Sequence, residues 1–361
     1  MNSEKTYGIN EVGNSVVAHD IHEILASALP WNSLFGKTVL VSGASGMIPS
    51  YVVYVLLALN DTQNAGINVR GLVRNGAKAR AILGDVVDRP DFALIEQDVA
   101  TAFVLDEPVD LIVHGASPAR PALHSNSPVD TIRANVQGAF NLLDACVASD
   151  GAHFVLMSSA EVYGQRPDDA NLVSEDSYGA VDILNPRACY TEGKRAAETI
   201  AVSYHAQYKV PITIARFGHI FGPGMALDDG RVQADFAADV IAHRDITLNS
   251  DGSARRTYTY LADAVAGMFS ALLLGENTAY NISDRDGFIS IRDLAHAFTA
   301  ARPHHELQVR YSEQVDISKY NPIQGQGLDD SRLRALGWTP HVGLSAGLDR
   351  TIAWHEERAA R

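Results

Sequence analysis

The stretch KTVLVSGASGMIP, residues 37–49, decides the fold of this 361-residue chain. Its first six residues predict a buried strand, and an apolar run of helical length follows as far as Leu59. The turn between them resembles a dinucleotide-binding turn, because Gly43 permits a tight turn and Gly46 lets a pyrophosphate approach backbone N–H groups at the helix start. The residues predicted to form this pyrophosphate site are Gly43, Ser45, Gly46, Met47 and Ile48.

The third small position of such a turn is usually glycine or alanine, and here it is Pro49. Proline is tolerated in a first helical turn, because the N–H group that it lacks would have no helical partner there. The departure therefore leaves the predicted unit of strand, turn and helix intact.

Strands and helices alternate along the first two thirds of the chain. After the first strand, apolar runs predict five more, at residues 67–73, 92–96, 109–114, 153–157 and 211–217. The alternation predicts an α/β fold with a doubly wound parallel sheet of the Rossmann type. Beyond Gly218 the elements become short and mixed, which predicts a smaller mixed C-terminal substrate-binding lobe.

The predicted organisation has three parts. Residues 1–35 form an N-terminal helical extension, in which apolar spacing predicts a helix over residues 17–29 that packs on the main domain or on a partner subunit. For residues 1–15 disorder is the alternative. Residues 36–218 form the dinucleotide-binding Rossmann domain, to which later segments return, and residues 219–361 form mainly the substrate-binding lobe.

Residues after three predicted strands are placed to contact a cofactor, because open α/β sheets bind ligands at the carboxyl ends of their strands. The second strand is followed by Arg74 instead of an acidic residue, which suits the 2′-phosphate of NADP or stacking on adenine, with exposed surface as the alternative. Asp98 and Val99 follow the third strand and are expected near the adenine. Ala116 and Ser117 follow the fourth strand, where small residues let the cofactor lie close.

The segment NPRACYTEGKRAAET, residues 185–199, places Tyr190 and Lys194 one helical turn apart on one face. The pKa of a tyrosine hydroxyl is about 10, so the group is a poor base at neutral pH unless a cation such as Lys194 lies beside it. This spacing alone is common, but the glycine turn lies upstream and a hydroxyl-rich strand end, SSAEVYG at 158–164, lies between the two. The three features in this order predict a nicotinamide-dependent enzyme.

Composition excludes several other classes of protein. Hydrophobic residues make up 46% and charged residues 20% of the chain, as in ordinary globular proteins, and the net charge of -14 argues against a nucleic-acid partner. No apolar stretch predicts a membrane span or a signal peptide, so we expect a cytoplasmic protein without a membrane partner. Cys146 and Cys189 are expected in the core, and no spacing of cysteine and histidine predicts a metal site.

Most of the chain from Gly36 onward resembles the extended short-chain dehydrogenase/reductase family that modifies nucleotide sugars. Within that family it is most similar to the branch of the UDP-glucuronate decarboxylases, also called UDP-xylose synthases. The stretches that carry the resemblance are SSAEVYG at 158–164, SED at 174–176, PRACYTEGKRAAET at 186–199, FGP and DGRV within 221–232, and the ending LRALGWTP at 333–340.

The resemblance implies a role for each member of the predicted catalytic set. Tyr190 is the base that takes the proton of the sugar 4-hydroxyl, and Ser159 bonds the same oxygen. Lys194 holds the cofactor ribose and lowers the pKa of Tyr190. Glu161 matches a glutamate that lies near C5 and the carboxylate of the sugar. Oxidation at C4 then creates a ketone β to that carboxylate, so CO2 leaves readily and the enzyme need only stabilise an enolate, without a metal.

The resemblance also implies ligands and partners. The cofactor is NAD, or NADP because of Arg74, and it stays tightly bound because the reaction cycle returns it unchanged. The substrate is a UDP-sugar, contacted by Ser117, Glu161, His219, Arg231 and Arg256. Family members are commonly homodimers through a four-helix contact that includes the helix of Tyr190, which Ala196, Ala197 and Ile200 would permit.

Three departures from the family pattern leave the reaction open. Ala160 stands where related 4,6-dehydratases have an aspartate, which disfavours ordinary dehydration. His219 replaces a substrate-contacting asparagine, and Gly224 replaces an arginine. A 4-epimerase is therefore the main alternative to a decarboxylase, although Glu161 disfavours it, and a dehydratase comes next. A binding protein without activity is disfavoured, because Ser159 and the Tyr190 helix complete a catalytic set.

Overall fold

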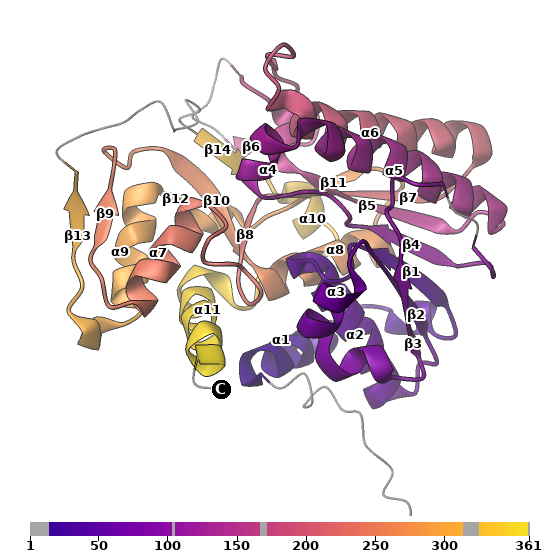
Figure 1. The fold of residues 1–361 in the computed structure, drawn as a ribbon, viewed down its shortest axis with the longest axis horizontal. Helices are drawn as coiled ribbons and strands as arrows, with labels where there is room; N and C mark the ends of the chain where they lie inside the picture. The colour runs from indigo at the N-terminus through magenta and orange to yellow at the C-terminus, as the bar shows by residue number, and fades with distance from the viewer. Residues whose placement is uncertain (1–13, 103–104, 167–171, 313–324, 360–361) are drawn as a thin grey trace, which may run out of the picture.

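The structure is a computed structural model that describes residues 14–102, 105–166, 172–312 and 325–359. Figure 1 shows a large sheet with helices on both of its faces, and a smaller lobe of short strands and helices beside it. The expectation of disorder for residues 1–15 falls almost wholly outside the described residues.

A seven-stranded parallel sheet forms the centre of the molecule, which confirms the predicted Rossmann-type fold. Its strand order is β11-β7-β5-β4-β1-β2-β3, so the chain starts in the interior of the sheet and builds outward in both directions. All six predicted strands form, and β5 continues to Ser159. The strands are β1 (Thr38–Ser42), β2 (Asn68–Val73), β3 (Phe92–Glu96), β4 (Leu111–His114), β5 (His153–Ser159), β7 (Ile212–Phe217) and β11 (Ala279–Ile282).

The two faces of the sheet are covered by different helices, because successive side chains of a strand point to opposite faces. In β1, Val39 and Val41 face the core that includes α2 and α8, whereas Leu40 faces the core that includes α5 and α6. Residues 261–282, which form α8 and β11, thus return to the large sheet. The helices are α2 (Met47–Gln63), α3 (Gly76–Leu83), α4 (Pro121–Asn126), α5 (Pro128–Ala148), α6 (Ala188–Tyr208) and α8 (Leu261–Leu274).

The smaller lobe is built around β10, which pairs with β8, β12 and β14. Its strands are β6 (Leu172–Val173), β8 (His219–Phe221), β9 (Ile246–Leu248), β10 (Arg255–Tyr260), β12 (Phe288–Ser290), β13 (Val309–Tyr311) and β14 (Gly325–Leu328). The helices after β8, apart from α8, are α7 (Val232–Ile241), α9 (Ile291–Ala300), α10 (Ser331–Arg334) and α11 (Gly343–Ala359). The 3₁₀ helices are η2 (Trp31–Leu34), η3 (Gly84–Asp88), η4 (Ala160–Tyr163), η5 (Arg285–Gly287) and η6 (Pro303–His305).

The N-terminal extension forms the helix α1 (Ser15–Ala26), which contacts α2, α8 and α11 of the same chain. The helix ends three residues earlier than the apolar spacing predicts, where the Ser27 hydroxyl bonds the carbonyl of Ile24. Asp20 of α1 is fully buried and accepts hydrogen bonds from Tyr51 of α2, at 2.9 Å, and Tyr260 of β10, at 2.7 Å. Arg350 of α11 also contacts this carboxylate at 2.8 Å, so one carboxylate joins four elements.

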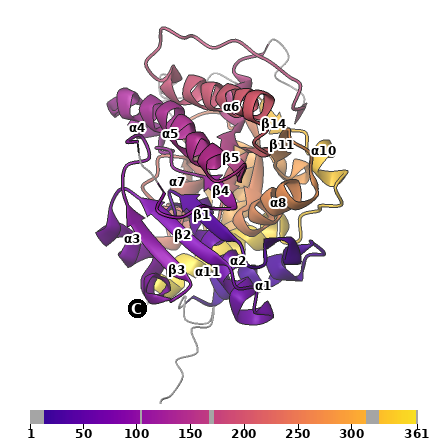
Figure 2. The same cartoon turned by 90° about the vertical axis from the view of Figure 1, so that its right-hand side faces the viewer.

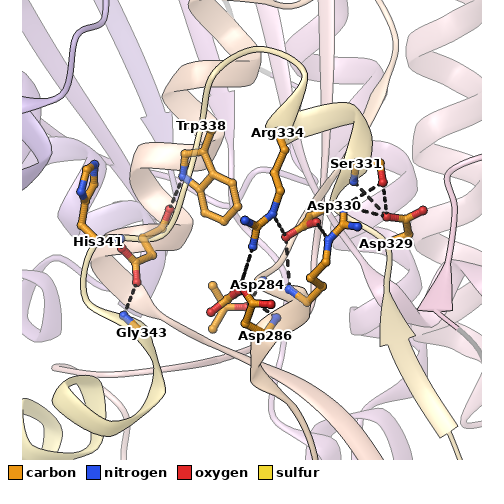
Figure 3. Close-up of polar contacts among 12 residues, drawn as sticks. Asp284, Asp286, Asp329, Asp330, Ser331, Arg334, Trp338, His341 and Gly343 are labelled. Carbon is orange, nitrogen blue, oxygen red and sulfur yellow. Dashed lines mark hydrogen bonds and ion pairs between the residues drawn. The ribbon is translucent and has the colours of Figure 1, made fainter.

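The C-terminal segment is attached to the rest of the molecule by polar contacts (Figure 3). Trp338 donates from its indole N–H to the carbonyl of Asp263 on α8, at 3.2 Å. The Asp263 carboxylate accepts backbone N–H bonds from His341, at 2.7 Å, and from Gly343, at 3.1 Å. These contacts position the start of α11.

A second group of contacts joins α10 to the loop after β11 (Figure 3). Arg334 lies between three carboxylates, at 2.9 Å from Asp330, 3.0 Å from Asp286 and 3.3 Å from Asp284. Only 4% of Asp284 is exposed, and burial is the main reason that its pKa is raised to about 6. The negative charge of Asp286 raises it further.

We predict that Asp284 makes stability depend on pH between about 4 and 6. Because its pKa is higher in the folded protein, folding favours the protonated acid, and this contribution is lost as pH rises through about 6. In urea unfolding, wild type should therefore lose free energy of unfolding relative to Asp284→Asn as pH is raised from 4 to 7. Asp88→Asn, at a carboxyl whose side chain is 73% exposed, is the control. A difference between wild type and Asp284→Asn that stays constant with pH would contradict the prediction.

Candidate active site

The glycine turn lies against the end of β4 and leaves no room for larger residues. Gly43 has a φ of 71°, and a Cβ atom there would lie 2.9 Å from backbone atoms of Ala116. Gly46 is the N-cap of α2 and makes no side-chain cap bond, so the first N–H groups of the helix, at Met47 and Ile48, are directed at the turn. Ser45 lies in the turn itself. A pyrophosphate fits this cradle, because helix N-termini bind anions.

The predicted adenosine end of the site contains a carboxylate that sequence reasoning missed. Arg74 is exposed directly after β2, as expected. Glu96 pairs in register with Val73 at the end of the adjacent strand, and its carboxylate lies against Gly76 at the start of α3. The signal was present in the sequence, because Glu96 ends the third predicted strand. An acidic group is therefore available at the end of β2 after all.

The ends of β3 and β4 provide the remaining predicted cofactor contacts. Asp98 accepts a hydrogen bond from the N–H group of Ala100 at 2.9 Å, and Val99 is buried against Gly138 of α5. Ala116 donates its N–H group to the Ser42 hydroxyl at 3.2 Å. The buried hydroxyl of Ser117 has no hydrogen-bond partner among the described residues. An unpaired buried hydroxyl is costly, so the Ser117 hydroxyl could accept or donate a hydrogen bond to a bound ligand.

Three members of the predicted catalytic set come together at the end of β5. The Tyr190 side chain is 9% exposed and forms a hydrogen bond with Ser159. Lys194 is 3% exposed, lies 5.9 Å from the centroid of the Tyr190 ring, and donates to the carbonyl of Met157 at 2.7 Å. Residues from β5 and α6 thus form one compact group, as expected from the spacing of the motifs.

The electrostatics of Tyr190 differ from the expectation that Lys194 lowers its pKa. Burial, and next the charge of Glu161, raise the pKa of Tyr190 to about 12. The hydrogen bond from Ser159 and the charge of Arg231 act in the opposite direction. Burial also lowers the pKa of Lys194 to about 8. The physical reason is that burial penalises the charged form of each of these two groups.

Glu161 lies beside this group, at the start of the 3₁₀ helix η4. Its backbone N–H donates to the Ser159 hydroxyl at 3.2 Å, and its carboxylate accepts a bond from the Thr191 hydroxyl at 3.2 Å. Thr191 is a second residue that sequence reasoning missed, although its position next to Tyr190 was a usable signal. Serine, glutamate and tyrosine are thus held within one polar network.

His124 of α4 is a third residue that sequence reasoning missed. Its ring stacks on that of Tyr190, with centroids 4.3 Å apart and planes at 12°. No sequence pattern linked the two residues, because α4 and α6 are brought together only by the fold. His114, by contrast, is a buried histidine of β4, with its ring bonded to the Ser42 hydroxyl at 2.9 Å.

The three predicted substrate residues of the smaller lobe also gather near this point. The charges of Arg231 and Arg256 both act on His219, and together with burial they lower its pKa to about 3. Arg231 also acts on Tyr190 and pairs with Asp229. Nδ1 of His219 is buried without a partner among the described residues. The arrangement offers positive charge and unpaired polar atoms to an anionic, hydroxyl-bearing ligand.

The described residues contain no group of three or more histidine, cysteine, aspartate or glutamate side chains that could hold a metal ion. Cys146 and Cys189 are buried free thiols. Within the same residues, no helix is long and apolar enough to cross a membrane.

The sequence of this chain is similar to that of known enzymes. The model of the NAD dependent epimerase/dehydratase family matches residues 39–283. UDP-glucuronic acid decarboxylase 2 of Arabidopsis thaliana is 32% identical over 325 residues, which cover 90% of this chain and 69% of that protein. UDP-glucuronic acid decarboxylase 1 of Danio rerio is 30% identical, and the match covers 88% of this chain and 72% of the relative.

Solved structures share the fold. A UDP-glucuronic acid 4-epimerase from Bacillus cereus, in complex with UDP-glucuronic acid and NAD, has a TM-score of 0.72 and 22% identity, and covers 89% of this chain and 99% of its own. A dTDP-glucose 4,6-dehydratase from Streptomyces venezuelae has a TM-score of 0.75 and 25% identity, over 90% of this chain and 98% of its own.

Proposed function

Because the chain belongs to the NAD-dependent epimerase/dehydratase family of nucleotide-sugar enzymes, we propose that it decarboxylates UDP-glucuronate through a 4-keto intermediate. The observation that carries the proposal is Glu161, whose carboxylate is held by Thr191 beside the Tyr190–Ser159 pair. The decarboxylases that are 30–32% identical to this chain support it.

Residues of the chain can perform the proton transfer at the sugar 4-hydroxyl and stabilise the enolate that follows. A bound nicotinamide supplies the reversible oxidation at C4. Tyr190 takes the proton of the 4-hydroxyl, assisted by the hydrogen bond from Ser159 and the charge of Arg231. Loss of CO2 breaks the C5–C6 bond and leaves the electron pair as an enolate on the C4 oxygen, which Tyr190 and Ser159 stabilise by hydrogen bonding. C5 then takes up a proton from water, and Tyr190 returns its proton to the C4 oxygen as C4 is reduced again.

The alternatives need groups that the site provides less well. Dehydration requires an acid that protonates the leaving 6-hydroxyl, and the buried Ala160 occupies the position between Ser159 and Glu161. A 4-epimerase needs the same first step and a rotation of the ketone, for which Glu161 has no evident use. His219 and Gly224 stand where the family has asparagine and arginine. Gly224, with a φ of 84°, lies near Met47, the first residue of α2.

We predict that incubation with UDP-glucuronate yields a product lighter by one CO2, measured by mass spectrometry. Tyr190→Phe should reduce the rate about 10²- to 10⁴-fold, because the base is lost. Glu161→Gln should allow oxidation at C4, seen as reduced cofactor, while CO2 release slows. Thr191→Val, which removes only the hydroxyl that bonds Glu161, should have a smaller effect of the same kind.

A product of unchanged mass would identify an epimerase, and loss of water a dehydratase; either result contradicts decarboxylation. If Glu161→Gln slowed oxidation and CO2 release equally, Glu161 would only position the sugar. Incubation with a panel of GDP-, CDP- and dTDP-sugars tests which nucleotide base the protein accepts in its substrate.

The cofactor is proposed to be NAD that stays bound and is recycled, because the reaction returns it unchanged. Glu96 at the end of β3 can accept bonds from an adenosine ribose, and its charge would repel a 2′-phosphate. Arg74 is exposed beside it and would attract one. The balance between these two side chains decides the preference for NAD over NADP.

We predict that the purified protein carries a nicotinamide dinucleotide, which extraction and mass analysis would identify. Glu96→Gln should strengthen NADP binding and Arg74→Asp should weaken it, each by roughly 10-fold, as for a charged hydrogen bond. The matched control is Arg80→Asp, because Arg80 is likewise an exposed arginine and lies farther along the chain, on α3. An unchanged preference in both variants contradicts these roles, and a protein that binds neither dinucleotide would not be an enzyme of this kind.

We also propose a homodimer formed through α5 and α6, which lie side by side on the outside of the sheet (Figures 1 and 2). The expected contact residue Ala197 is fully buried in the core of its own chain, so it cannot serve, and Ala196 and Ile200 are half-buried. The large apolar side chains that are exposed on the two helices are Val129, Ile132, Phe140, Val147, Val202 and Tyr208.

Phe140→Glu combined with Val147→Glu should convert a dimer into a monomer, measured by light scattering after gel filtration. The physical reason is that two charges would have to be buried in an apolar contact. Ile82→Glu on α3, at an equally exposed position on the other face of the sheet, is the control. A monomeric wild type, or a double variant that remains dimeric, would contradict this interface.

A further inference from the structure

His124 is buried and held rigidly against the proposed base. Only 2% of it is exposed, and its ring lies parallel to the Tyr190 ring at 4.3 Å between centroids. The Cys189 thiol donates to the carbonyl of His124 at 3.4 Å, so the end of α4 is attached to the start of α6. Lys194 lies against the same tyrosine ring, at 5.9 Å from its centroid. Tyr190 therefore has two basic side chains in contact with its ring.

The hydrogen bonds of His124 define its tautomer. Nε2 lies 3.0 Å from the carbonyl oxygen of Pro118, and a carbonyl can only accept, so Nε2 carries the proton. Nδ1 of the neutral ring is then a bare acceptor. It is buried and has no hydrogen-bond partner in the part of the chain that the structure describes. A second proton can therefore be added at Nδ1 without breaking an existing bond.

Groups on the surrounding elements act in opposite directions on the pKa of His124. Glu161 of η4 favours the protonated form, as does the Pro118 carbonyl. Arg187, which precedes α6, and Arg231, which precedes α7, disfavour it, and so does burial, which is the main reason that the pKa of His124 is lowered. The other titratable groups in contact are Tyr190 and Cys189, whose pKa values burial raises, so both are neutral near pH 7. The free protein thus holds a neutral imidazole at neutral pH.

We propose that His124 takes up a proton at Nδ1 when an anionic nucleotide sugar binds, and that the imidazolium stacked on Tyr190 favours the phenolate that removes the substrate proton. The anionic class of ligand rests on the proposed function. A diphosphate or carboxylate beside Arg231 and Arg187 would offset the two cations that oppose protonation. His124 is a positioning residue in this scheme, because it acts through Tyr190, and its proton comes from solvent and returns there when the product leaves.

Proton uptake can be measured separately from turnover. We would titrate the NAD-loaded full-length protein with UDP-glucose, which has no carboxylate to lose and no group that titrates between pH 6 and 8. Calorimetry in buffers of different ionisation enthalpy gives the number of protons taken up per ligand bound. For wild type we expect uptake that rises toward, at most, about one proton per site as pH is lowered from 8 toward 6.5.

Two variants separate the proton from the packing. His124→Phe keeps the stacked ring, and His124→Gln keeps a donor for the Pro118 carbonyl, but neither can take up a proton. Both should bind UDP-glucose with less proton uptake than wild type, by up to about one proton per site. Any uptake by Lys194, whose pKa is lowered to about 8, remains in all three proteins. With UDP-glucuronate, both variants should lose about 10-fold in kcat for each unit by which the pKa of Tyr190 rises. His205→Phe is the matched control, because its ring also lies against a backbone carbonyl, Val210, at 2.8 Å, but at the far end of α6.

Nuclear magnetic resonance of ¹⁵N-labelled histidine, assigned with His124→Phe, tests the premise without any ligand. We expect the neutral Nε2–H tautomer at pH 7. A proton on Nδ1 in the free protein, or binding of UDP-glucose without proton uptake, overturns the inference and leaves the proposed reaction intact. A different outcome would reject only the proposed reaction. In that case wild type takes up a proton on binding UDP-glucose, His124→Phe takes up less, and wild type releases no CO2 from UDP-glucuronate. Failure of every nucleotide sugar to bind would reject both.

Discussion

The active-site arrangement depends on one buried ion pair, between Arg216 of β7 and Glu198 of α6. Arg216 is 8% exposed, and its guanidinium bonds the carboxylate at 2.7 and 3.0 Å, while the Ser158 hydroxyl of β5 donates to the same carboxylate at 2.5 Å. Removing one partner of such a pair leaves a buried charge and typically costs about 3–5 kcal/mol. The pair therefore fixes α6 to two strands, and Lys194, one turn before Glu198, then faces the end of β5.

This attachment explains why the chemistry can be placed on rigid elements. Ser159 ends β5, Glu161 follows it in η4, and Tyr190 extends from the first turn of α6, so the distances between them are set by strand and helix positions. The same burial that orders these groups also opposes their charged forms, which is why the pKa of Tyr190 is raised to about 12. In a chain with a net charge of -14, the positive charge that favours the ionised Tyr190 comes from a local residue, Arg231.

Patterns of neighbouring residues predicted most of the fold and the central part of the site. The stretch at 37–49 predicted β1, the glycine turn and α2, because all three are specified by residues adjacent in sequence. The spacing of Tyr190 and Lys194 is likewise a property of one helix. Apolar periodicity was less reliable at element boundaries, as at the end of α1, where Ser27 adopts an extended conformation and the helix stops although apolar residues continue to Leu29.

The sequence by itself determined the class of fold, the order of its strands along the chain and the residue types of the proposed catalytic set, because each depends on local spacing and residue chemistry. Only the tertiary structure decided that Glu96 lies beside the end of β2, that His124 stacks on Tyr190, and that Ala197 faces the core. The contacts of these residues are with elements distant in sequence, so no local pattern contains them. The same holds for ionisation, because the pKa of a tyrosine follows from how deeply the folded chain buries it.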